Sequence, residues 1–275
     1  EFVQVKLTEN GDFLENIIAI SASEYSSYAL TENGEVYSWG YNYYGQLGDN
    51  TRSNRAYPVK MKKVECIFQI DAGSNNVLML DANGTVWGCG YNYYGQLGLS
   101  ENGSTYNYLP EQMKNEDGTD ILRNIKKVSS GYHHSLLLKE DNTVLATGEN
   151  SYGQLGTNDT TRYYFPKQVL DSEGNKIENI KDILAKGSSS ILTSKTLTEI
   201  NENKEEITKN GMYVLGQNYS GGLFTNDKNT RKKAEFIETN EELIVVAGTE
   251  INLVWFIHQD IMQMVKKAKI QLFLQ

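Results

Sequence analysis

One eight-residue segment, YNYYGQLG, occurs twice in the chain, at Tyr41–Gly48 and again at Tyr91–Gly98. A weaker copy, ENSYGQLG, spans Glu149–Gly156, and a more divergent one, QNYSGGLF, spans Gln217–Phe224. Copies separated by about 50 residues indicate one supersecondary unit repeated along the chain. We therefore expect a single repeat domain over residues 1–275, whose fold follows from the fold of its unit.

The copies align well beyond this segment. Each unit begins with a short apolar run, a turn of small residues and a second apolar run, and a third run then leads into a Gly-x-Asn-x-x-Gly-Gln-Leu-Gly loop. The runs have the length of β-strands and are bounded by turn residues. The complete units span 17–61, 67–113, 125–170 and 180–237, a partial unit spans 243–275, and 1–8 resembles the final strand of a preceding or closing unit.

Two local signals mark the ends of the strands. Asn-Gly pairs stand between the second and third runs at Asn33-Gly34, Asn83-Gly84 and Asn210-Gly211, and they predict type I′ hairpins because both residues tolerate positive φ. Prolines precede the expected fourth strands, with Pro58 before Val59–Met61, Pro110 before Glu111–Met113 and Pro166 before Lys167–Leu170. Proline belongs at the start or edge of a strand. Four short antiparallel strands in about 50 residues are typical of a β-propeller blade.

These motifs resemble those of a known family. GYHHS at Gly131–Ser135, the Gly-Gln-Leu-Gly loops and the proline strands are similar to regulator of chromosome condensation repeats over most of residues 17–237. The resemblance implies a seven-bladed β-propeller, and the composition, rich in Lys, Asn, Ile and Tyr, suggests a bacterial-type member. We expect an all-β propeller of four complete blades plus partial terminal units. An unclosed propeller leaves sheet edges unpaired, so we favour a ring completed by further repeats. The alternatives are a smaller ring closed by pairing of the first strand with the last unit, and self-association.

The overall composition limits the classes of partner. A net charge of −9, from 26 basic and 35 acidic residues, argues against binding to a nucleic-acid backbone. No apolar run approaches the ~20 residues of a membrane span, and residues 1–30 contain no signal-peptide pattern. The bacterial cell surface and the cytoplasm both remain open as locations.

Catalytic and metal-binding patterns are nearly absent. The chain has three histidines, His133, His134 and His258, which are too few for a typical zinc site, and the first two belong to the turn motif, where we expect structural hydrogen bonds. No P-loop, Gly-x-Ser-x-Gly or EF-hand spacing occurs. Cys66 and Cys89 are expected to be small buried hydrophobic residues. We therefore expect no catalytic residue, no metal, no cofactor and no enzymatic activity.

The residues that recur in the loops are expected to serve the fold. The glycines permit positive φ or close backbone approach, the leucines fill apolar holes, and the glutamines bond to nearby backbone. This structural set is Gly40, Asn42, Gly45, Gln46, Leu47, Gly48, Gly90, Asn92, Gly95, Gln96, Leu97, Gly98, Gly148, Asn150, Gly153, Gln154, Leu155 and Gly156.

Tyrosine is the candidate for binding, with 18 Tyr against 8 Phe and 3 Trp. Interfaces are enriched in Tyr because it combines a large rigid apolar area with a hydroxyl group. Since the loops recur by rotation, their tyrosines are expected to gather on one face, although some can also pack between blades as framework. The predicted partner-binding residues are Tyr41, Tyr43, Tyr44, Tyr91, Tyr93, Tyr94 and Tyr152. Four further tyrosines lie beyond the loops, at Tyr106, Tyr108, Tyr163 and Tyr164.

Two segments depart from the repeat. Lys195–Asn210, KTLTEINENKEEITKN, replaces a short turn in the fourth unit and predicts either a projecting hairpin or a solvated charged loop. The tail, Ile261–Gln275, fits a strand slightly better than a helix.

Three functions remain open at this stage. The leading one is a non-catalytic module that binds a partner protein through a Tyr-rich propeller face. The family resemblance also implies a guanine-nucleotide exchange factor for a small GTPase. Aromatic rims can stack on sugars as well, so a cell-surface glycan-binding module is the third hypothesis.

Overall fold

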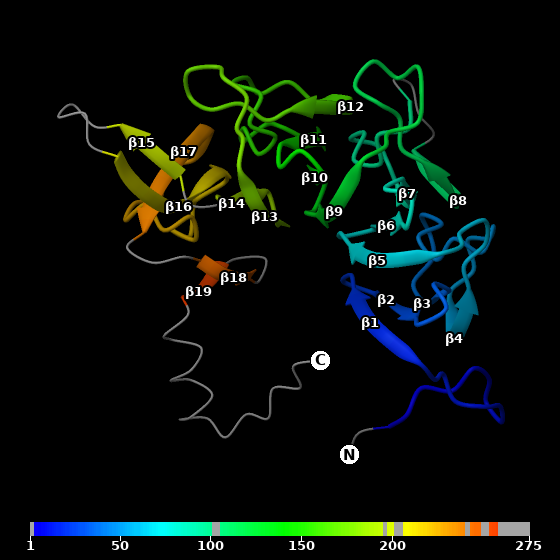
Figure 1. The fold of residues 1–275 in the computed structure, drawn as a ribbon. Coiled ribbons are helices and arrows are strands. Elements are labelled where there is room, and N and C mark those ends of the chain that lie inside the picture. Colours follow the sequence, from blue (N-terminus) through cyan, green and yellow to red (C-terminus); the bar gives the residue numbers. More distant parts are fainter. Residues whose placement is uncertain are drawn as a thin grey trace, which may run out of the picture.

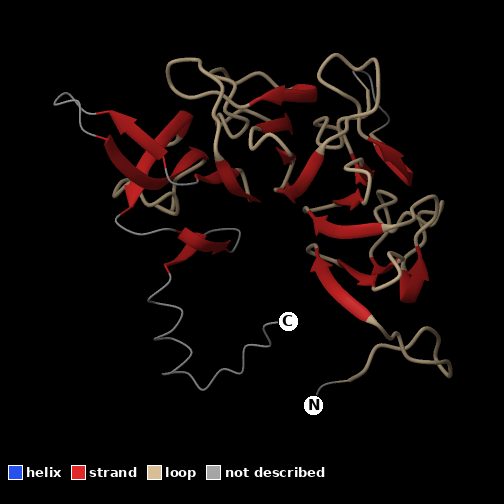
Figure 2. Cartoon of the chain, in the orientation of Figure 1, coloured by secondary structure: helices blue, strands red, loops and turns tan. Residues whose placement is uncertain are grey.

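The structure is a computed structural model that describes residues 3–100, 105–194, 197–200, 206–239, 243–248 and 253–257. The regular secondary structure in these ranges consists of β-strands, and no helix occurs in them. The sheets follow one another along an arc, and β1, β5, β9 and β13 are the strands nearest its centre (Figure 1). Figure 2 shows the all-strand character of the chain. The expected all-β propeller architecture is confirmed.

The first three blades are four-stranded antiparallel sheets with strands in chain order. Blade 1 contains β1 (Ile17–Ala22), β2 (Ser26–Thr31), β3 (Val36–Gly40) and β4 (Arg55–Lys60). Blade 2 contains β5 (Ile67–Ala72), β6 (Asn76–Asp81), β7 (Val86–Tyr91) and β8 (Tyr106–Gln112). Blade 3 contains β9 (Ile125–Ser130), β10 (His134–Lys139), β11 (Val144–Gly148) and β12 (Tyr163–Gln168).

Blade 4 carries an additional strand. Its sheet contains β13 (Ile180–Lys186), β14 (Ser189–Ser194), β16 (Glu206–Gly216) and β17 (Arg231–Thr239), and β15 (Leu197–Ile200) pairs with the beginning of β16. The pairing runs from Leu197 opposite Lys209 to Ile200 opposite Glu206, so the insertion forms a backbone hairpin. A fifth sheet contains β18 (Leu243–Gly248) and β19 (Leu253–Ile257). The expected tail strand and His258 lie outside the described residues.

The predicted type I′ turns are wrong. In the first two blades only the glycine of each pair has positive φ, 76° at Gly34 and 73° at Gly84. This is the geometry of a type I turn followed by a left-handed residue, which closes a longer hairpin loop. Asn142, with φ of 64°, takes the place of this glycine in blade 3. Asn210-Gly211 forms no turn because both residues lie inside the continuous strand β16, which the inserted hairpin lengthens at its beginning.

The predicted starts of the fourth strands are also wrong. β4, β8 and β12 begin several residues earlier, so that Pro58, Pro110 and Pro166 lie inside them. Each of these strands pairs with its neighbour through an irregular register and is the last strand of its sheet. A proline is tolerated there because it removes a donor only from the unpaired edge.

The beginning of the described chain repeats the end of a blade. Lys6 forms a β-bridge with Phe13, and the equivalent bridges after β8 and β12 join Lys114 to Ile121 and Leu170 to Lys176. The Leu14 N–H donates to the Val5 carbonyl, as the Leu122 N–H does to the Met113 carbonyl. The segment from Val5 to Leu14 thus has the same local backbone pairing that follows β8 and β12.

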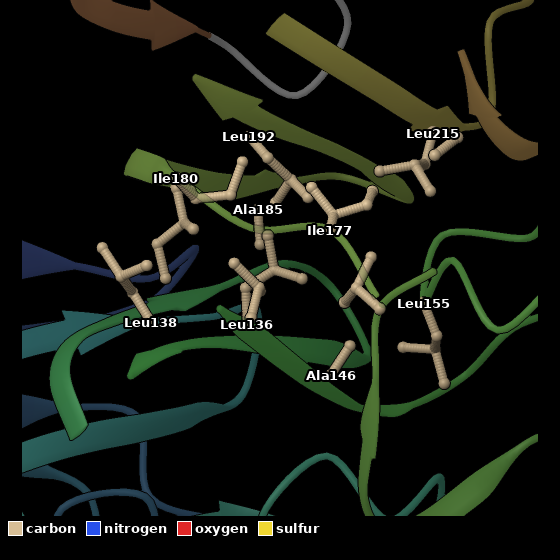
Figure 3. Packing of buried hydrophobic residues seen from close by; sticks show 13 residues of the cluster. Leu136, Leu138, Ala146, Leu155, Ile177, Ile180, Ala185, Leu192 and Leu215 are labelled. Atoms are coloured by element: carbon tan, nitrogen blue, oxygen red, sulfur yellow. The ribbon is translucent and has the colours of Figure 1, made fainter. Parts of the chain in front are cut away.

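The hydrophobic core is divided among the blade interfaces. Between blades 3 and 4, for example, Leu136 and Leu138 of β10 pack with Ile180 and Ala185 of β13, and all four side chains are at most 2% exposed (Figure 3). Equivalent clusters join blade 1 to blade 2 and blade 2 to blade 3. Burial of this kind stabilises each blade against the next one, so the blades hold their loops in a defined relative position.

A repeated polar contact accompanies each of these interfaces. The fifth residue of an innermost strand accepts a hydrogen bond from the backbone N–H of the sixth residue in the next innermost strand. The pairs are Ser21 with Ala72 (2.9 Å), Asp71 with Ser130 (2.6 Å) and Ser129 with Ala185 (3.0 Å). These contacts fix the register between neighbouring blades near the propeller axis.

Candidate functional site

Each loop after the third strand is organised by a buried asparagine. Asn42 Oδ1 accepts the Leu47 N–H at 2.9 Å, and Asn42 Nδ2 donates to Asp49 Oδ1 at 3.1 Å. Gln46 Oε1 accepts the Tyr44 N–H at 3.1 Å. The corresponding Asn and Gln bonds recur at Asn92, Gln96, Asn150 and Gln154, and the Asn bond also recurs at Asn218. Side-chain acceptors for loop N–H groups make the loop backbone rigid.

Each loop also packs against the next blade, which requires glycine. Gly45 has φ of 80°, and a Cβ there would lie 2.6 Å from the Cα of Tyr108 in β8. Gly95 has φ of 84° and makes the same approach to Tyr164 in β12, at 2.7 Å. This close contact brings the tyrosines of one loop against the aromatic residues of the following blade.

The result is a continuous series of aromatic ring contacts across three blades. Its members, which we call the tyrosine face, are Tyr25, Tyr41, Tyr43, Tyr44, Tyr106, Tyr91, Tyr93, Tyr94, His133 and Tyr132. Tyr44 connects blades 1 and 2, with its ring centroid 5.0 Å from that of Tyr91. Tyr94 connects blades 2 and 3, since it stacks on His133 at 4.4 Å with an interplanar angle of 19°.

Blades 1 and 2 present the same arrangement of rings. Tyr41 and Tyr43 are stacked at 6.3 Å and 18°, and Tyr91 and Tyr93 at 6.3 Å and 19°. Tyr43 and Tyr93 are the outermost of these side chains, 47% and 51% exposed. The identical octapeptides therefore produce two equivalent subsites on the tyrosine face.

Two arginines lie over these rings. The Arg52 guanidinium is 4.2 Å from the ring centroid of Tyr43, and its Nε donates to the Tyr43 carbonyl at 2.9 Å. The Arg162 guanidinium is 4.6 Å from the ring centroid of Tyr94 and 5.2 Å from that of Tyr93. Cation–π contacts of this kind hold a guanidinium in place over the rings.

Burial favours the protonated phenol at two positions of the tyrosine face, Tyr91 and Tyr44. Burial, followed by the neighbouring phenol of Tyr94, raises the pKa of Tyr91 to about 12. Burial also raises the pKa of Tyr44. Tyr44 and Tyr91 therefore add no negative charge beside the two arginines.

One predicted binding residue lies apart from this series. Tyr152 contacts Tyr219 of blade 4, with ring centroids 5.8 Å apart, and makes no ring contact with the tyrosine face among the described residues. Its loop has Glu149 where the first two loops have Tyr41 and Tyr91. The series therefore stops at the third blade.

Several residues of the site were not predicted. Tyr25 and His133 occupy equivalent turns, where their carbonyls accept the N–H groups of Tyr41 and Glu149. The regular position of this turn in every unit was the signal that could have identified them. Arg52 and Arg162 follow the loops at different offsets, so no repeat pattern marked them. Tyr108 and Tyr164 lie beside these arginines, whereas the Tyr163 hydroxyl donates to Asp159.

The histidine and cysteine predictions have mixed outcomes. His134 is buried, and its Nε2 lies 2.9 Å from Ser190 Oγ. The Ser190 hydroxyl already donates its proton to the Gln154 carbonyl, so Ser190 Oγ is the acceptor and His134 Nε2–H is the donor. Burial lowers the pKa of His134 to about 3, so the ring is neutral. Cys89 is buried as expected, but Cys66 is exposed. Cys66 lies in the turn before β5 with φ of 53°, where its backbone packs against Gly34.

A small cavity of about 220 Å³ lies beside the tyrosine face, at the turns near the propeller axis. Its lining includes Glu24, Ser74, Tyr132 and Lys186. Within the described ranges, no cluster of three or more His, Cys, Asp or Glu side chains could hold a metal ion. No helix long and apolar enough to cross a membrane occurs in that part of the chain.

Family models match the repeats directly. The model described as "Regulator of chromosome condensation (RCC1) repeat" matches residues 33–80, 83–138 and 141–184. A second RCC1 repeat model matches 17–46, 69–96 and 125–154. The chain belongs to the RCC1 repeat family. The loops that carry the tyrosine face lie within the residues matched by these RCC1 repeat models.

Curated relatives share the repeat region. This RCC1 repeat chain is 31% identical over 165 residues to the probable E3 ubiquitin-protein ligase HERC4 of Homo sapiens, covering 60% of this chain and 15% of HERC4. It is 27% identical over 167 residues to the ultraviolet-B receptor UVR8 of Arabidopsis thaliana, covering 60% of this chain and 37% of UVR8. The chain thus spans a minor part of the length of these relatives.

Solved structures show the same fold. Human WBSCR16 superposes with a TM-score of 0.72 at 19% identity, over 92% of this chain and 64% of that one. Prp20p from Saccharomyces cerevisiae superposes with a TM-score of 0.65 at 18% identity, over 92% of this chain and 59% of that one. Prp20p has binding properties toward Gsp1p and histones, and yeast RCC1 has also been solved with Kap60 bound. RCC1-type propellers therefore include binders of protein partners.

Proposed function

We propose that this chain is a non-catalytic protein-interaction module that binds its partner through the tyrosine face. The observation that supports this function best is the continuous series of ring contacts from Tyr25 to Tyr132, because it forms one aromatic surface across three blades. Interfaces between proteins are enriched in Tyr and Arg and depleted in Lys and Glu at their centres. The face has this composition.

The rigidity of the loops also supports the proposal. Binding is weakened when mobile side chains and loops must be ordered. Here the buried bonds of Asn42 and Gln46 already order the first loop, and neighbouring rings restrict Tyr43 and Tyr93. A preorganised aromatic surface loses little conformational entropy on binding, which is the basis of its use in antibody paratopes.

The test compares Tyr43→Ala/Tyr93→Ala with the parent chain in affinity capture from the source organism, with captured proteins identified by mass spectrometry and then measured in purified form. These two residues are half exposed, so their loss should leave the fold intact. Tyr57→Ala is the matched control, because Tyr57 is 39% exposed on β4 and belongs to no ring contact of the face. We expect a purified partner to lose at least about tenfold in affinity only in the double variant.

Other outcomes would replace this proposal. Equal affinity of the parent and the double variant would show that the tyrosines are framework. Accelerated GDP release from a Ran-type GTPase would instead support nucleotide exchange. Retention on cell-wall polysaccharide that free sugar competes away would support glycan binding.

A further inference from the structure

Within the described part of the chain, the two arginines over the tyrosine face have no acidic partner, although the chain is acidic overall. Among the described residues, neither Arg52 nor Arg162 forms an ion pair, and the net charge of the chain is −9. Two other arginines behave differently. Arg55 pairs with Asp49 at 2.5 Å, and Arg231 pairs with Asp227 at 2.8 Å. Arg55 and Arg231, which begin β4 and β17, are thus paired with carboxylates, whereas no carboxylate of the described residues pairs with Arg52 or Arg162.

Their hydrogen bonds leave donors available. Arg52 uses Nε on the Tyr43 carbonyl, and Arg162 uses Nη1 on the Tyr164 hydroxyl at 3.3 Å and on the Tyr93 carbonyl at 3.5 Å. A guanidinium has five N–H donors in a planar fork that matches a carboxylate. Each arginine is therefore held in position with N–H groups free for an anion.

Among the described residues, the loop carboxylates near the centre of the face have partners of their own, Asp49 with Arg55 and Asp159 with the Tyr163 hydroxyl, and two glutamates lie toward the ends of the face. Glu24 adjoins Tyr25 in blade 1, where its hydrogen bond is the largest cause of the raised pKa of that phenol. Glu149 accepts a hydrogen bond from Ser151 in blade 3. The central part, with Tyr43 and Tyr93 beneath their arginines, is cationic and aromatic.

We propose that the tyrosine face recognises an acidic, extended polypeptide segment of the partner, with carboxylates on Arg52 and Arg162 and apolar side chains on Tyr43 and Tyr93. The two equivalent subsites favour a segment that crosses from blade 1 to blade 2. Charge complementarity is the reason for assigning an acidic occupant, since charge-assisted bonds to Arg are stronger than neutral ones. This inference rests on the proposed function.

The test selects displayed random peptides of about twelve residues on the whole chain and measures the selected peptides by fluorescence anisotropy. We expect the selected sequences to be enriched in Asp and Glu. Arg52→Gln/Arg162→Gln should lose at least about tenfold in affinity for them, and added salt should weaken the parent more than this variant. Arg52→Lys/Arg162→Lys should retain part of the affinity, because it keeps the charge but loses the fork.

Arg123→Gln is the matched control, because it removes one exposed positive charge before β9, at the opposite end of that strand from Tyr132. Its affinity should stay within about twofold of the parent. The selected peptides could instead lack acidic enrichment and still need Tyr43 and Tyr93 for binding. That result would contradict the acidic partner but would still support the tyrosine face as the binding surface. If no selected peptide depends on those tyrosines, both proposals fail.

A sulfated polysaccharide is a separate arm of the test. Heparin binding that requires Arg52 and Arg162, together with no binding of acidic peptides, would also overturn the inference. It would identify the two arginines as a site for a sulfated chain.

Discussion

Asp71 and Ser130 join the second and third blades, because Asp71 Oδ2 accepts the backbone N–H of Ser130 at 2.6 Å. The equivalent acceptors at the neighbouring interfaces are the hydroxyls of Ser21 and Ser129. A carboxylate therefore stands in a position that needs only a neutral acceptor. Burial raises the pKa of Asp71 to about 6, against the lowering effects of the Ser130 N–H, Ser129 and the more distant Lys186 and Lys127.

The raised pKa of Asp71 predicts a pH dependence of stability. The folded chain holds this proton up to about pH 6, whereas the unfolded chain releases it near pH 4. The stabilisation of the folded chain by the protonated Asp71 carboxyl is therefore fully present below about pH 4, and it is lost as pH rises through about 6. Between about pH 5 and 7.5 we expect a loss of about 1–2 kcal/mol in the free energy of unfolding, and Asp71→Asn should remove it. Urea unfolding of both proteins at about pH 5 and 7.5 measures the difference, and parallel pH profiles would contradict it.

His134 should produce the opposite trend. Its folded pKa of about 3 lies below the usual value near 6.5, so the unfolded chain takes up the proton first as pH falls. Stability should fall below about pH 6.5, by about 2 kcal/mol at pH 5. His134→Asn cannot titrate and should show a flatter profile than the parent in the same urea series. Because the Asp71 effect runs the other way over part of this range, each single variant must be compared separately with the parent.

Removing the hydroxyl of Ser129 should destabilise the interface between blades 3 and 4. Ser129 is buried, and Ser129→Ala leaves the N–H of Ala185 without its 3.0 Å acceptor. An unsatisfied buried N–H costs about 1–3 kcal/mol. Ser21→Ala is the comparison, because Ser21 is only half buried and water can replace its hydroxyl. Equal losses in urea unfolding would show that the buried N–H is not the cause.

Gly45→Ala should destabilise the chain and disturb the tyrosine face. The new Cβ would lie 2.4 Å from Cδ1 and 2.6 Å from Cα of Tyr108, at a φ of 80°. We expect a loss of about 3 kcal/mol, of which left-handed strain supplies about 1–2. Gly174→Ala is the control, since Gly174 has φ of 95° but nothing lies within 4 Å of its Cβ position. A thermal shift no larger than that of the control would exclude the clash.

Local features of the blades were predictable from the chain. Leu47, Leu97 and Leu155 are fully buried, at 0% exposure, as their recurrence in an apolar position indicated. The Asn-Gly turns were predicted with the wrong geometry because the pair is also compatible with a left-handed glycine alone. Cys66 was expected to be buried because cysteine usually is, but its turn places it at the surface.

The candidate site was predictable only in part. The loop tyrosines were identified from their repetition, yet the separation of Tyr152 from the other six could not be predicted, because it depends on which ring the next blade presents. Arg52 and Arg162 left no repeated signal in the sequence. Arg52 lies over Tyr43 of its own loop, whereas Arg162 lies over Tyr94 of the preceding blade, a contact between segments far apart in the chain.

The amino-acid sequence by itself determined the repeat, the four-stranded unit and the loop bonds of Asn42 and its equivalents, because these depend on neighbours within one unit. Tertiary structure decided the contact of Tyr44 with Tyr91, the position of Arg162 over Tyr94 and the raised pKa of Asp71. Each of these depends on the rotation from one blade to the next. That rotation is set by the packing of side chains between blades, which no single unit contains.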